Sequence, residues 1–348
     1  MYKVKRPFAG DVPLAGRSDC STALSAGPEA ALSHLGRVPQ SIMIDLAVYY
    51  EHPAWFEPLF KLLDQRGLSW TRVPIQDHVL DPVALVSPAP VVFNRLAMSS
   101  FLRQGEHAIY HSLAALWHWE LAGARVLNGS AALNIDISKA RQLSLLRSLR
   151  LEVPKTRVVH CRADVALAAE QIGFPVIVKP NVGGSGSGVT RYDTAAELAA
   201  HLASGSTPAG LDGVTLVQEY VPCRHARVLR CETLNGRFLY AIALNGAGST
   251  FDLCPADVCM VDKPTISIES FQPPADIVQA VESVARAAHL DVGGIEYMVD
   301  DRDGVAKFYD INALSNFVAQ PLQVLGWDPH EKLVDFLTEV VAAKRKAA

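Results

Sequence analysis

Short apolar runs that alternate with helical segments restrict the fold of this chain more than any other feature. The first run, IMIDLAVYY, begins at Ile42 and is followed by a segment of helical pattern that ends at Gly67. After it come, in order, strand-like WTRVPI and PVVFNRLA, helical HAIYHSLAALWHWELAGA and strand-like RVLNG. Strands that alternate with helices are typical of a parallel sheet with helices on its faces. We therefore predict a small parallel-sheet α/β domain over residues 41–130.

The rest of the chain, residues 131–348, predicts a mixture of helices and paired strands. Helices are predicted from about Ser138, ending before Pro154, and in DVALAAEQI, TAAELAAHLAS (capped by Asp193 or Thr194), PADIVQAVESVARAAHL and DPHEKLVDFLTEVVAAK. In PADIVQAVESVARAAHL the apolar residues Ile277, Val281, Val284 and Ala288 form a stripe on one face of the helix. Strands are predicted in VIVK, TLVQEYV, RVLRCETL, RFLYAIAL, IEYMVD and VAKFYDIN. Asn235-Gly236 and the segment 301–304 each lie between two of these strands and favour antiparallel turns.

Length and composition exclude several classes of protein. A chain of 348 residues is long enough for about two domains. With 49% apolar and 20% charged residues it can form a large buried core. The net charge of -4 shows no basic excess, so we expect no nucleic-acid partner. No run of about 18 apolar residues is present, so we expect no membrane span. The prediction that follows is a cytoplasmic protein.

The first 40 residues differ from the remainder. They are rich in Gly, Pro, Ser and Ala, and they lack both apolar periodicity and the apolar core of a signal peptide. We expect an extension that is loosely docked or disordered.

The cysteines are scattered and form no CxxC pair, which favours reduced thiols over a disulfide framework or a zinc site. They are Cys20, Cys161, Cys223, Cys231, Cys254 and Cys259.

The segment VKPNVGGSGSGV, residues 178–189, contains four glycines and two serines. Its glycine spacing resembles a P-loop, but Val189-Thr190 stand where that motif needs Lys and Ser/Thr, and a dinucleotide fingerprint does not fit either. A loop between two strands remains, whose backbone N–H groups could bind an anion. Taken alone, a flexible hairpin tip without a ligand fits equally well. Lys179 favours the anion, because a lysine at the end of a buried strand needs an anionic partner.

A second constellation lies in the last predicted hairpin. Asp310 and Asn312 are two apart on a strand, so both point to one face, and Glu296 lies on the preceding strand. Mg²⁺ prefers such oxygen ligands. Incidental polar residues on a solvent-facing hairpin are the alternative. The strongly apolar flanking residues favour the metal, because a carboxylate in such surroundings needs a cation.

Three further candidates have ordinary explanations when each is taken alone. Lys139 lies in the first turn of a predicted helix, where most lysines are solvated. Gln218–Val221 end a strand and could offer backbone groups to a planar base, with Glu219 free to contact a polar edge. Asn94 and Arg95 end another strand, and Arg95 could bind a substrate carboxylate or form a surface ion pair.

In this order, Lys139, Lys179, the glycine loop, the QEYV segment and the Glu296 to Asn312 set resemble the ATP-grasp superfamily. The resemblance is strongest to the carboxylate–amine ligases, which include glutamyl-tail ligases, D-alanine–D-alanine ligase and glutathione synthetase. It implies an α/β protein with an ATP-grasp fold, in which two α+β subdomains clasp the nucleotide. It also implies a lid subdomain at about residues 150–217, and it makes residues 41–130 the small α/β domain that precedes the grasp.

The resemblance also implies roles for individual residues. Lys139 and Lys179 would contact the phosphates of ATP, and Arg230 would lie near the transferred phosphoryl group. The residues expected to close over the phosphates are Gly183, Gly184, Ser185, Gly186, Ser187 and Gly188. Those expected to hold adenine and the ribose are Gln218, Glu219, Tyr220 and Val221. Those expected to hold Mg²⁺, or Mn²⁺ in its place, are Glu296, Asp310 and Asn312.

Two departures from the family pattern follow one another in the sequence. Asp310 stands where glutamate is usual, and Ala313-Leu314-Ser315-Asn316 replace the usual small-Pro-Gly segment. Because that segment commonly helps to bind substrate, Ser315 and Asn316 are candidate substrate contacts.

The activity implied by the resemblance is ATP-dependent ligation of a small carboxylate to an amine, such as an amino acid or a short peptide. An acyl phosphate would be the intermediate, and ADP and phosphate would be released. The alternatives are a phosphotransferase on the same scaffold and a non-catalytic ATP-binding protein. A homodimer is the default expectation for a soluble protein of this kind.

Overall fold

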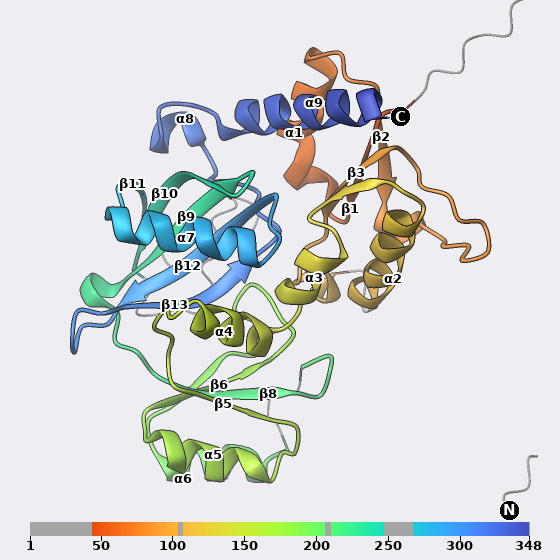
Figure 1. The fold of residues 1–348 in the computed structure, drawn as a ribbon. Coiled ribbons are helices and arrows are strands. Elements are labelled where there is room, and N and C mark those ends of the chain that lie inside the picture. Colours follow the sequence, from red (N-terminus) through yellow and green to blue (C-terminus); the bar gives the residue numbers. More distant parts are fainter. Residues whose placement is uncertain (1–43, 104–106, 206–209, 247–266, 348) are drawn as a thin grey trace, which may run out of the picture. The chain divides into compact units, whose positions relative to one another are not determined.

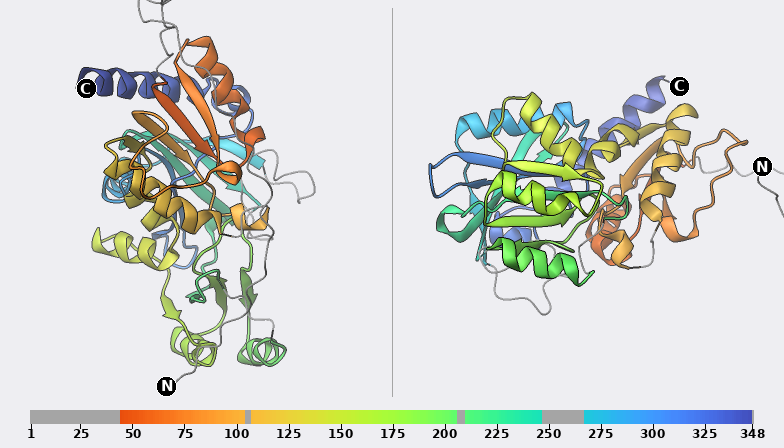
Figure 2. Two further views of the ribbon diagram at one scale, coloured as in Figure 1. Left: turned by 90° about the vertical axis from the view of Figure 1, so that its right-hand side faces the viewer. Right: turned by 90° about the horizontal axis from the view of Figure 1, so that it is seen from below.

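The computed structural model describes residues 44–103, 107–205, 210–246 and 267–347. The extension predicted over residues 1–40 lies outside these ranges, as do Cys20, Cys254 and Cys259. Cys161, Cys223 and Cys231, which are described, carry free thiols. The described strands form three sheets, which Figures 1 and 2 show from three sides. No helix within the described ranges is long and apolar enough to cross a membrane.

The first sheet confirms the predicted parallel α/β pattern. Its strands pair in the order β2-β1-β3-β4, and every pair is parallel. The elements are β1 (Leu46–Tyr50), α1 (Pro53–Gln65), β2 (Trp70–Pro74), η1 (Ile75–Asp77), β3 (Val91–Arg95), η2 (Ser100–Leu102), α2 (Ala108–Leu121) and β4 (Arg125–Leu127).

Both faces of this sheet are covered, which explains why β1 is apolar throughout. Leu46 and Val48 pack in the same cluster as α1 and the C-terminal helix α9 (Pro329–Ala347). Ala47 and Tyr49 point the other way, into a cluster that contains the inner side of α2. Successive strand residues face opposite sides of a sheet, so a strand buried on both faces needs apolar residues at every position.

The second sheet has five antiparallel strands in the order β11-β10-β9-β12-β13. The strands are β9 (Arg227–Leu234), β10 (Arg237–Asn245), β11 (Ser267–Phe271), β12 (Val292–Val299) and β13 (Ala306–Asn312). The hairpins predicted at Asn235-Gly236 and before β13 are both confirmed. Helix α7 (Ala275–Ala287) lies along one face (Figure 1), and its predicted stripe of Ile277, Val281, Val284 and Ala288 is buried there.

The third sheet has the strand order β5-β8-β6-β7, and each pair is antiparallel. Its strands are β5 (Thr156–Val159), β6 (Val176–Pro180), β7 (Thr190–Tyr192) and β8 (Thr215–Glu219). Helices α5 (Asp164–Ile172) and α6 (Ala195–Ala203) cover one face, as Figure 1 shows. Val176 and Val178 pack against these helices, so Ile177 and Lys179 face the opposite side.

Short helices connect the sheets. They are α3 (Ser130–Asp136), α4 (Lys139–Ser148), η3 (Arg224–Ala226) and α8 (Pro321–Val324). The start of α4 confirms the prediction, because the Ser138 side chain accepts a hydrogen bond from the amide of Arg141 and caps the helix. Helices α3, η3 and α8 and strands β5 and β11 were not predicted from the sequence.

Candidate functional site

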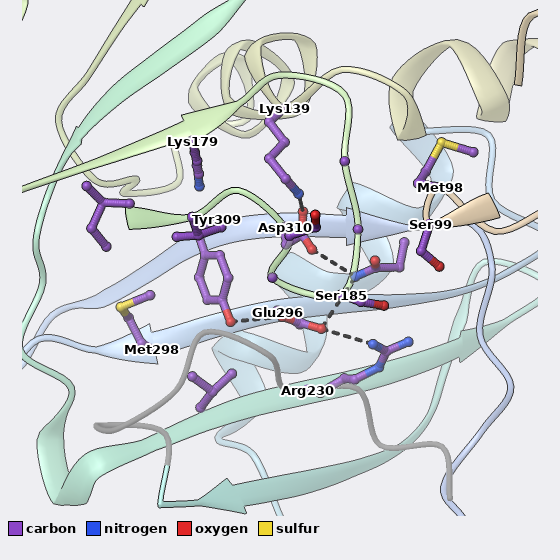
Figure 3. A pocket seen from close by; sticks show the side chains of 18 of the residues that line it. Met98, Ser99, Lys139, Lys179, Ser185, Arg230, Glu296, Met298, Tyr309 and Asp310 are labelled. Atoms are coloured by element: carbon purple, nitrogen blue, oxygen red, sulfur yellow. Dashed lines mark hydrogen bonds and ion pairs between the residues drawn. The ribbon is translucent and has the colours of Figure 1, made fainter. Parts of the chain in front are cut away.

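A cavity of about 360 Å³ lies between the five-stranded sheet and the antiparallel sheet β5-β8-β6-β7, which we call the four-stranded sheet from here on. A segment that follows β3 lies beside the cavity (Figure 3). It brings together most of the candidate residues. These are Lys139, Lys179, Gly183, Gly184, Ser185, Gly186, Ser187, Gln218, Glu219, Tyr220, Val221, Arg230, Glu296, Asp310, Asn312 and Asn316. The candidates that do not line it are Asn94, Arg95, Gly188 and Ser315.

Strand register places three charged residues in one row across the five-stranded sheet. Arg230 on β9 is opposite Glu296 on β12, and Glu296 is opposite Asp310 on β13. The predicted convergence of Glu296, Asp310 and Asn312 follows from this register. Asn312 Nδ2 lies 3.3 Å from Asp310 Oδ2 and 3.4 Å from Glu296 Oε1. We call Arg230, Glu296, Asp310 and Asn312 the charged row.

A β-bulge adds a tyrosine to the charged row. The register shifts after Glu296, so Tyr309 is an extra residue between the paired Phe308 and Asp310. Its hydroxyl donates to Glu296 Oε2 at 2.8 Å, and its ring lines the cavity. A bulge commonly redirects one side chain in this way. Sequence reasoning missed this residue, because strict alternation would turn Tyr309 away from Asp310.

Arg230 is 6% exposed and lies between two carboxylates. Its Nε donates to Glu232 Oε1 at 2.6 Å, and its Nη1 donates to Glu296 Oε1 at 2.9 Å. Burial alone would lower the pKa of Arg230, but Glu232 and Glu296 raise it above its ordinary value. Arg230 therefore stays charged and holds Glu296 in position.

The glycine pair before Glu296 explains how Arg230 fits. A Cβ built on Gly294 would lie 2.6 Å from Arg230 Nη2 and 2.8 Å from its Cζ. A Cβ on Gly293 would lie 2.7 Å from the carbonyl oxygen of Asn312. Gly294 therefore leaves the space that the guanidinium occupies, and Gly293 allows β12 and β13 to approach closely.

The two lysines have different surroundings. Lys139 Nζ lies 2.6 Å from Asp310 Oδ1. Burial would lower the pKa of Lys139, but Asp310 raises it overall. Lys179 is 7% exposed, and its Nζ donates to the neutral amide oxygen of Gln218 at 3.0 Å. Burial, with a smaller effect from Lys139, lowers the pKa of Lys179 to about 7.

The glycine loop joins β6 to β7, as the sequence predicted, and it reaches across to the first domain. A Cβ on Gly184 would lie 3.0 Å from the amide nitrogen of Ser99 and 3.3 Å from the carbonyl carbon of Met98. Met98 and Ser99 line the cavity beside Ser185 (Figure 3). The loop therefore closes one side of the cavity by backbone contact, and this contact requires glycine.

Asn181 fixes the base of this loop against helix α4. Its Oδ1 accepts hydrogen bonds from the amide of Ala140 at 3.0 Å and from Ser138 Oγ at 3.1 Å. Its Nδ2 donates to Asp212 at 2.6 Å. These bonds set the first turn of α4, and with it Lys139, beside the glycine loop. No local sequence pattern pointed to this role of Asn181.

The expectation that Glu219 is free to contact a polar edge is wrong. Its Oε1 lies 3.0 Å from Lys307 Nζ, and its Oε2 lies 3.0 Å from Arg302 Nη2. Burial would raise the pKa of Glu219, but these bonds and that from the Lys155 amide lower it. The carboxylate is therefore committed to an ion-pair network behind the QEYV segment. Glu219 and the two residues after it, Tyr220 and Val221, still line the cavity.

Asn94 and Arg95 lie behind the cavity wall. The Asn94 side chain donates to the carbonyl of Asn128 and accepts from the amide of Leu96. Arg95 is 2% exposed, and its Nη2 donates to the carbonyl of Ser315. Burial lowers the pKa of Arg95 to about 9. Direct substrate contact does not fit these two residues, because Arg95 holds the loop after β13 from its far side.

Ser315 and Asn316 differ in a similar way. Ser315 Oγ accepts a hydrogen bond from the amide of Phe317 at 3.1 Å, and Ser315 is buried. The Ser315 hydroxyl therefore stabilises the turn, and Ser315 does not line the cavity. Asn316 lines the cavity. Of the two, only Asn316 is placed to meet a substrate.

Two buried residues near the charged row carry signals that sequence reasoning did not use. Asp136 lines the cavity at the end of α3, and burial, followed by the charge of Asp310, raises its pKa to about 7. Asn128 is fully buried and joins the first sheet to β12 and β13. Its Nδ2 donates to the carbonyls of Val292 at 2.6 Å and Ala313 at 2.5 Å. Polar residues inside apolar segments are the signal that could have found both.

Comparison with known proteins identifies the class. Residues 137–335, more than half of the chain, match the family model of the RimK-like ATP-grasp domain. The chain therefore belongs to the RimK-like ATP-grasp family, which confirms the resemblance seen in the sequence.

Curated relatives include ligases of two kinds. A probable alpha-L-glutamate ligase of Enterobacter sp. (strain 638) is 32% identical over 143 residues, which are 40% of this chain and 46% of the relative. A D-alanine–D-alanine ligase of Anaeromyxobacter dehalogenans is 29% identical over 231 residues, which are 63% and 69% of the two chains. The chain thus spans about half the length of the first of these relatives.

Solved structures share the fold at low sequence identity. A D-alanine–D-alanine ligase from Bacillus anthracis complexed with ATP superposes with a TM-score of 0.61 at 16% identity, covering 88% of this chain and 99% of that one. The ATP-grasp ligase PsnB complexed with a minimal precursor gives 0.59 at 17% identity, covering 86% and 99%. These comparisons confirm the predicted ATP-grasp fold.

Proposed function

We propose that this protein is an ATP-dependent carboxylate–amine ligase that forms an amide or peptide bond through an acyl phosphate. The observation that carries the proposal is the placement of Lys139, Lys179 and the glycine loop opposite the charged row in one cavity. Membership of the RimK-like family and the ligase names of the curated relatives support it.

The cavity has the hydrogen-bond donors that the phosphates of a nucleoside triphosphate require. Lys139 and Lys179 supply two ammonium groups, and the glycine loop supplies backbone N–H groups beside them. Lys179 has a neutral partner and a lowered pKa, so an anion beside it would relieve the effect of its burial. We assign adenine to the backbone of Tyr220 and Val221, next to the apolar side chain of Met298.

The charged row fits Mg²⁺, with Mn²⁺ as an alternative. Glu296 and Asp310 offer two carboxylates, and the Asn312 side chain contacts both of them through its Nδ2. A turn of that amide would present its oxygen as a third hard ligand. When bound, the ion would neutralise phosphate charge. Glu296 and Asp310 are each paired with a cationic side chain, Arg230 and Lys139. The role of these carboxylates as metal ligands is part of the proposal.

The reaction divides into two transfers. The substrate carboxylate attacks the γ-phosphorus of ATP, and the bond to the bridging oxygen breaks, which gives an acyl phosphate and ADP. The amine then attacks the acyl carbon, phosphate leaves, and the amine loses a proton. Phosphoryl transfer depends mainly on positioning and charge neutralisation. We assign the positioning to Lys139 and Lys179, charge stabilisation at the transferred group to Arg230, and exclusion of water to the glycine loop.

The substrates are a small carboxylate and an amine, and we infer that at least one is an amino acid or a short peptide. The relatives named as L-glutamate ligases and D-alanine–D-alanine ligases act, by their names, on such compounds. Met98 and Ser99 line the cavity where the glycine loop contacts their backbone, and Asn316 lines it as well; these are the side chains we expect to select the substrate.

The experiment is to incubate the protein with MgATP and a panel of amino acids and dipeptides, and to measure ADP, phosphate and the ligated product. A ligase releases ADP and phosphate in equal amounts with the amide. AMP and pyrophosphate would contradict the proposal. A stable phosphorylated product without free phosphate would indicate the phosphotransferase. Magnesium-dependent ATP binding without turnover of any substrate pair would indicate the non-catalytic alternative.

A further inference from the structure

Helix α2 exposes an apolar stripe on the side that faces away from its own sheet. Tyr110, Ala114, Trp117 and Leu121 recur at intervals of four, three and four residues, which places them on one face of a helix. Tyr110 is 41% exposed, Trp117 58% and Leu121 59%. The opposite side of the same helix is already buried, through Ile109, Leu116 and Trp119.

The connection between β2 and β3 extends this surface. Val79, Val83, Leu85 and Val86 in that loop are between 55% and 91% exposed. His78, at the start of the loop, joins it to α2, because its Nδ1 lies 3.0 Å from Nε2 of His111. Figure 1 and the right-hand view of Figure 2 both show the loop beside α2. We call these eight residues, four on α2 and four in the loop, the apolar patch.

We propose that the apolar patch is the interface of a homodimer, in which α2 of one protomer packs antiparallel against α2 of a second copy. The four-three-four spacing is the pattern that two helices use when they pack along a shared apolar stripe. A two-fold interface must be complementary to itself. An axis near the small residue Ala114 meets this condition, because Tyr110 would then face the partner's Trp117 and Trp117 would face the partner's Tyr110.

The size of the patch agrees with a dimer. Its seven large side chains together expose several hundred Å² of apolar surface, on the order of the ~800 Å² that each partner buries in a standard interface. Single apolar side chains are commonly exposed on a monomer, whereas an apolar patch of this size usually marks an interaction site. A second copy is the one partner that is always present at the concentration of the protein itself.

The chemistry of the patch also favours a protein partner over a membrane surface. Residues 108–119 contain no Asp, Glu, Lys or Arg, and Asp81 is the one charged residue in the segment 78–90. Interface cores are poor in charge and rich in Tyr and Trp. A helix that lies on an anionic bilayer instead carries Lys and Arg along its flanks. Such a surface would also repel the acidic residues near this patch, which are Asp77, Asp81 and Asp212.

The test is the association state of the full chain, measured by sedimentation velocity between about 1 and 100 μM. We expect a dimer in the wild-type protein and at least a tenfold increase in the dimer dissociation constant for Trp117→Glu. The matched control is Leu167→Glu, because Leu167 is 56% exposed on helix α5 and lies outside the patch. This control should associate like the wild type. Circular dichroism and thermal unfolding of all three proteins establish that each is folded.

A cross-link provides the second measurement. Ala114→Cys should form a disulfide between protomers under mild oxidation, beyond what the wild-type cysteines form under the same conditions. A wild-type protein that stays monomeric throughout the range would overturn the proposal. So would a dimer that Trp117→Glu leaves intact, or binding of the monomer to phosphatidylserine vesicles through Trp117. Each of these results is independent of the ligase assay.

Discussion

The five-stranded sheet presents side chains to the cavity that are already paired with one another, whereas the four-stranded sheet presents a lysine and a loop of backbone amides. On the five-stranded sheet, Arg230, Glu296 and Tyr309 are joined by hydrogen bonds of 2.8 to 2.9 Å. On the four-stranded sheet β5-β8-β6-β7, Lys179 has a neutral amide as its partner, and Gly184 in the loop after β6 depends on contact with the backbone of another domain.

This difference separates two tasks of one site. The paired side chains are organised before any ligand arrives, so their positions depend on the protein alone. The lysine and the loop gain most from an anion, and a loop of glycines loses much conformational freedom when it is ordered. The five-stranded sheet is therefore suited to stabilising a transition state, and the four-stranded sheet to capturing and enclosing the nucleotide.

Removal of Arg230 should have the largest effect, because it takes away the buried cation at one end of the charged row. In Arg230→Met, Glu232 and Glu296 lose their buried cation, which should lower the free energy of unfolding by about 3–5 kcal/mol. Loss of one positioned charge at the reacting group should lower kcat by about 10²–10³-fold. ADP release and urea unfolding measure the two effects. Arg227→Met, on the same strand but in a half-exposed ion pair, is the control.

The outcome that would contradict this organisation is specific. If Arg230→Met lost stability but retained kcat within threefold, Arg230 would be a structural residue and the charged row would not reach the reaction. If Arg227→Met were equally impaired, the effect would belong to the strand and not to the cavity.

Gly294→Ala tests the same sheet without removing a charge. Its Cβ would lie 2.6 Å from Arg230 Nη2, so the guanidinium must move away from Glu296. We expect kcat to fall by about 10–10²-fold, since one group is displaced and not deleted. In the Arg230→Met background the same substitution should have little further effect, because the two changes act through one contact. Additive losses in the double variant would show that Gly294 acts by another route.

The fold was more accessible from the sequence than the site, and particular residues show why. The spacing of Asp310 and Asn312 and the apolar stripe of α7 are local patterns, and the structure confirmed the arrangement expected from both. The bulge at Tyr309 depends on which residue of β12 pairs with it, so no pattern within β13 reveals it. Arg95 ends a strand in sequence, but a loop from 220 residues away covers it.

Asn128 and Asn181 extend the same lesson. Each joins segments that are distant in the chain, and each side chain makes three or more hydrogen bonds. The sequence shows only a polar residue beside a glycine or a proline. The roles assigned to the site residues, and the domain limits near residues 130 and 150, stay predictions.

On the side of the four-stranded sheet, Gly184→Ala should have a smaller effect. The added Cβ would meet backbone atoms of Met98 and Ser99, which cannot rotate away as a side chain could. The loop should close less completely, so we expect about a tenfold loss in kcat/KM with a higher KM for ATP. Gly183→Ala is the control, because its Cβ would touch only the ring of Pro180, at 3.3 Å, and the carbonyl of Ser187. Equal losses in both variants would refute closure against the first domain.

The smallest expected effect concerns the protonation of Lys179, and it compares the two sheets most directly. Its pKa is lowered to about 7, so at pH 8 it is mostly neutral in the free protein. A bound triphosphate should raise this pKa, because a nearby anion favours the ammonium form. Binding at pH 8 should therefore take up close to one proton per nucleotide, whereas at pH 6 it should take up almost none. Calorimetry in buffers of different ionisation enthalpy measures this uptake.

Lys179→Met is the variant that assigns the proton. It should abolish the uptake at pH 8 and weaken binding, while Arg230→Met should leave the uptake unchanged, because Arg230 stays charged at every pH in this range. Proton uptake that persists in Lys179→Met would show that another group titrates. It would remove the main argument that Lys179, on the four-stranded sheet, becomes charged only when an anion binds. Proton uptake that is lost in both variants would show that the two sides of the cavity do not act separately, because binding of the nucleotide beside Lys179 would then depend on Arg230.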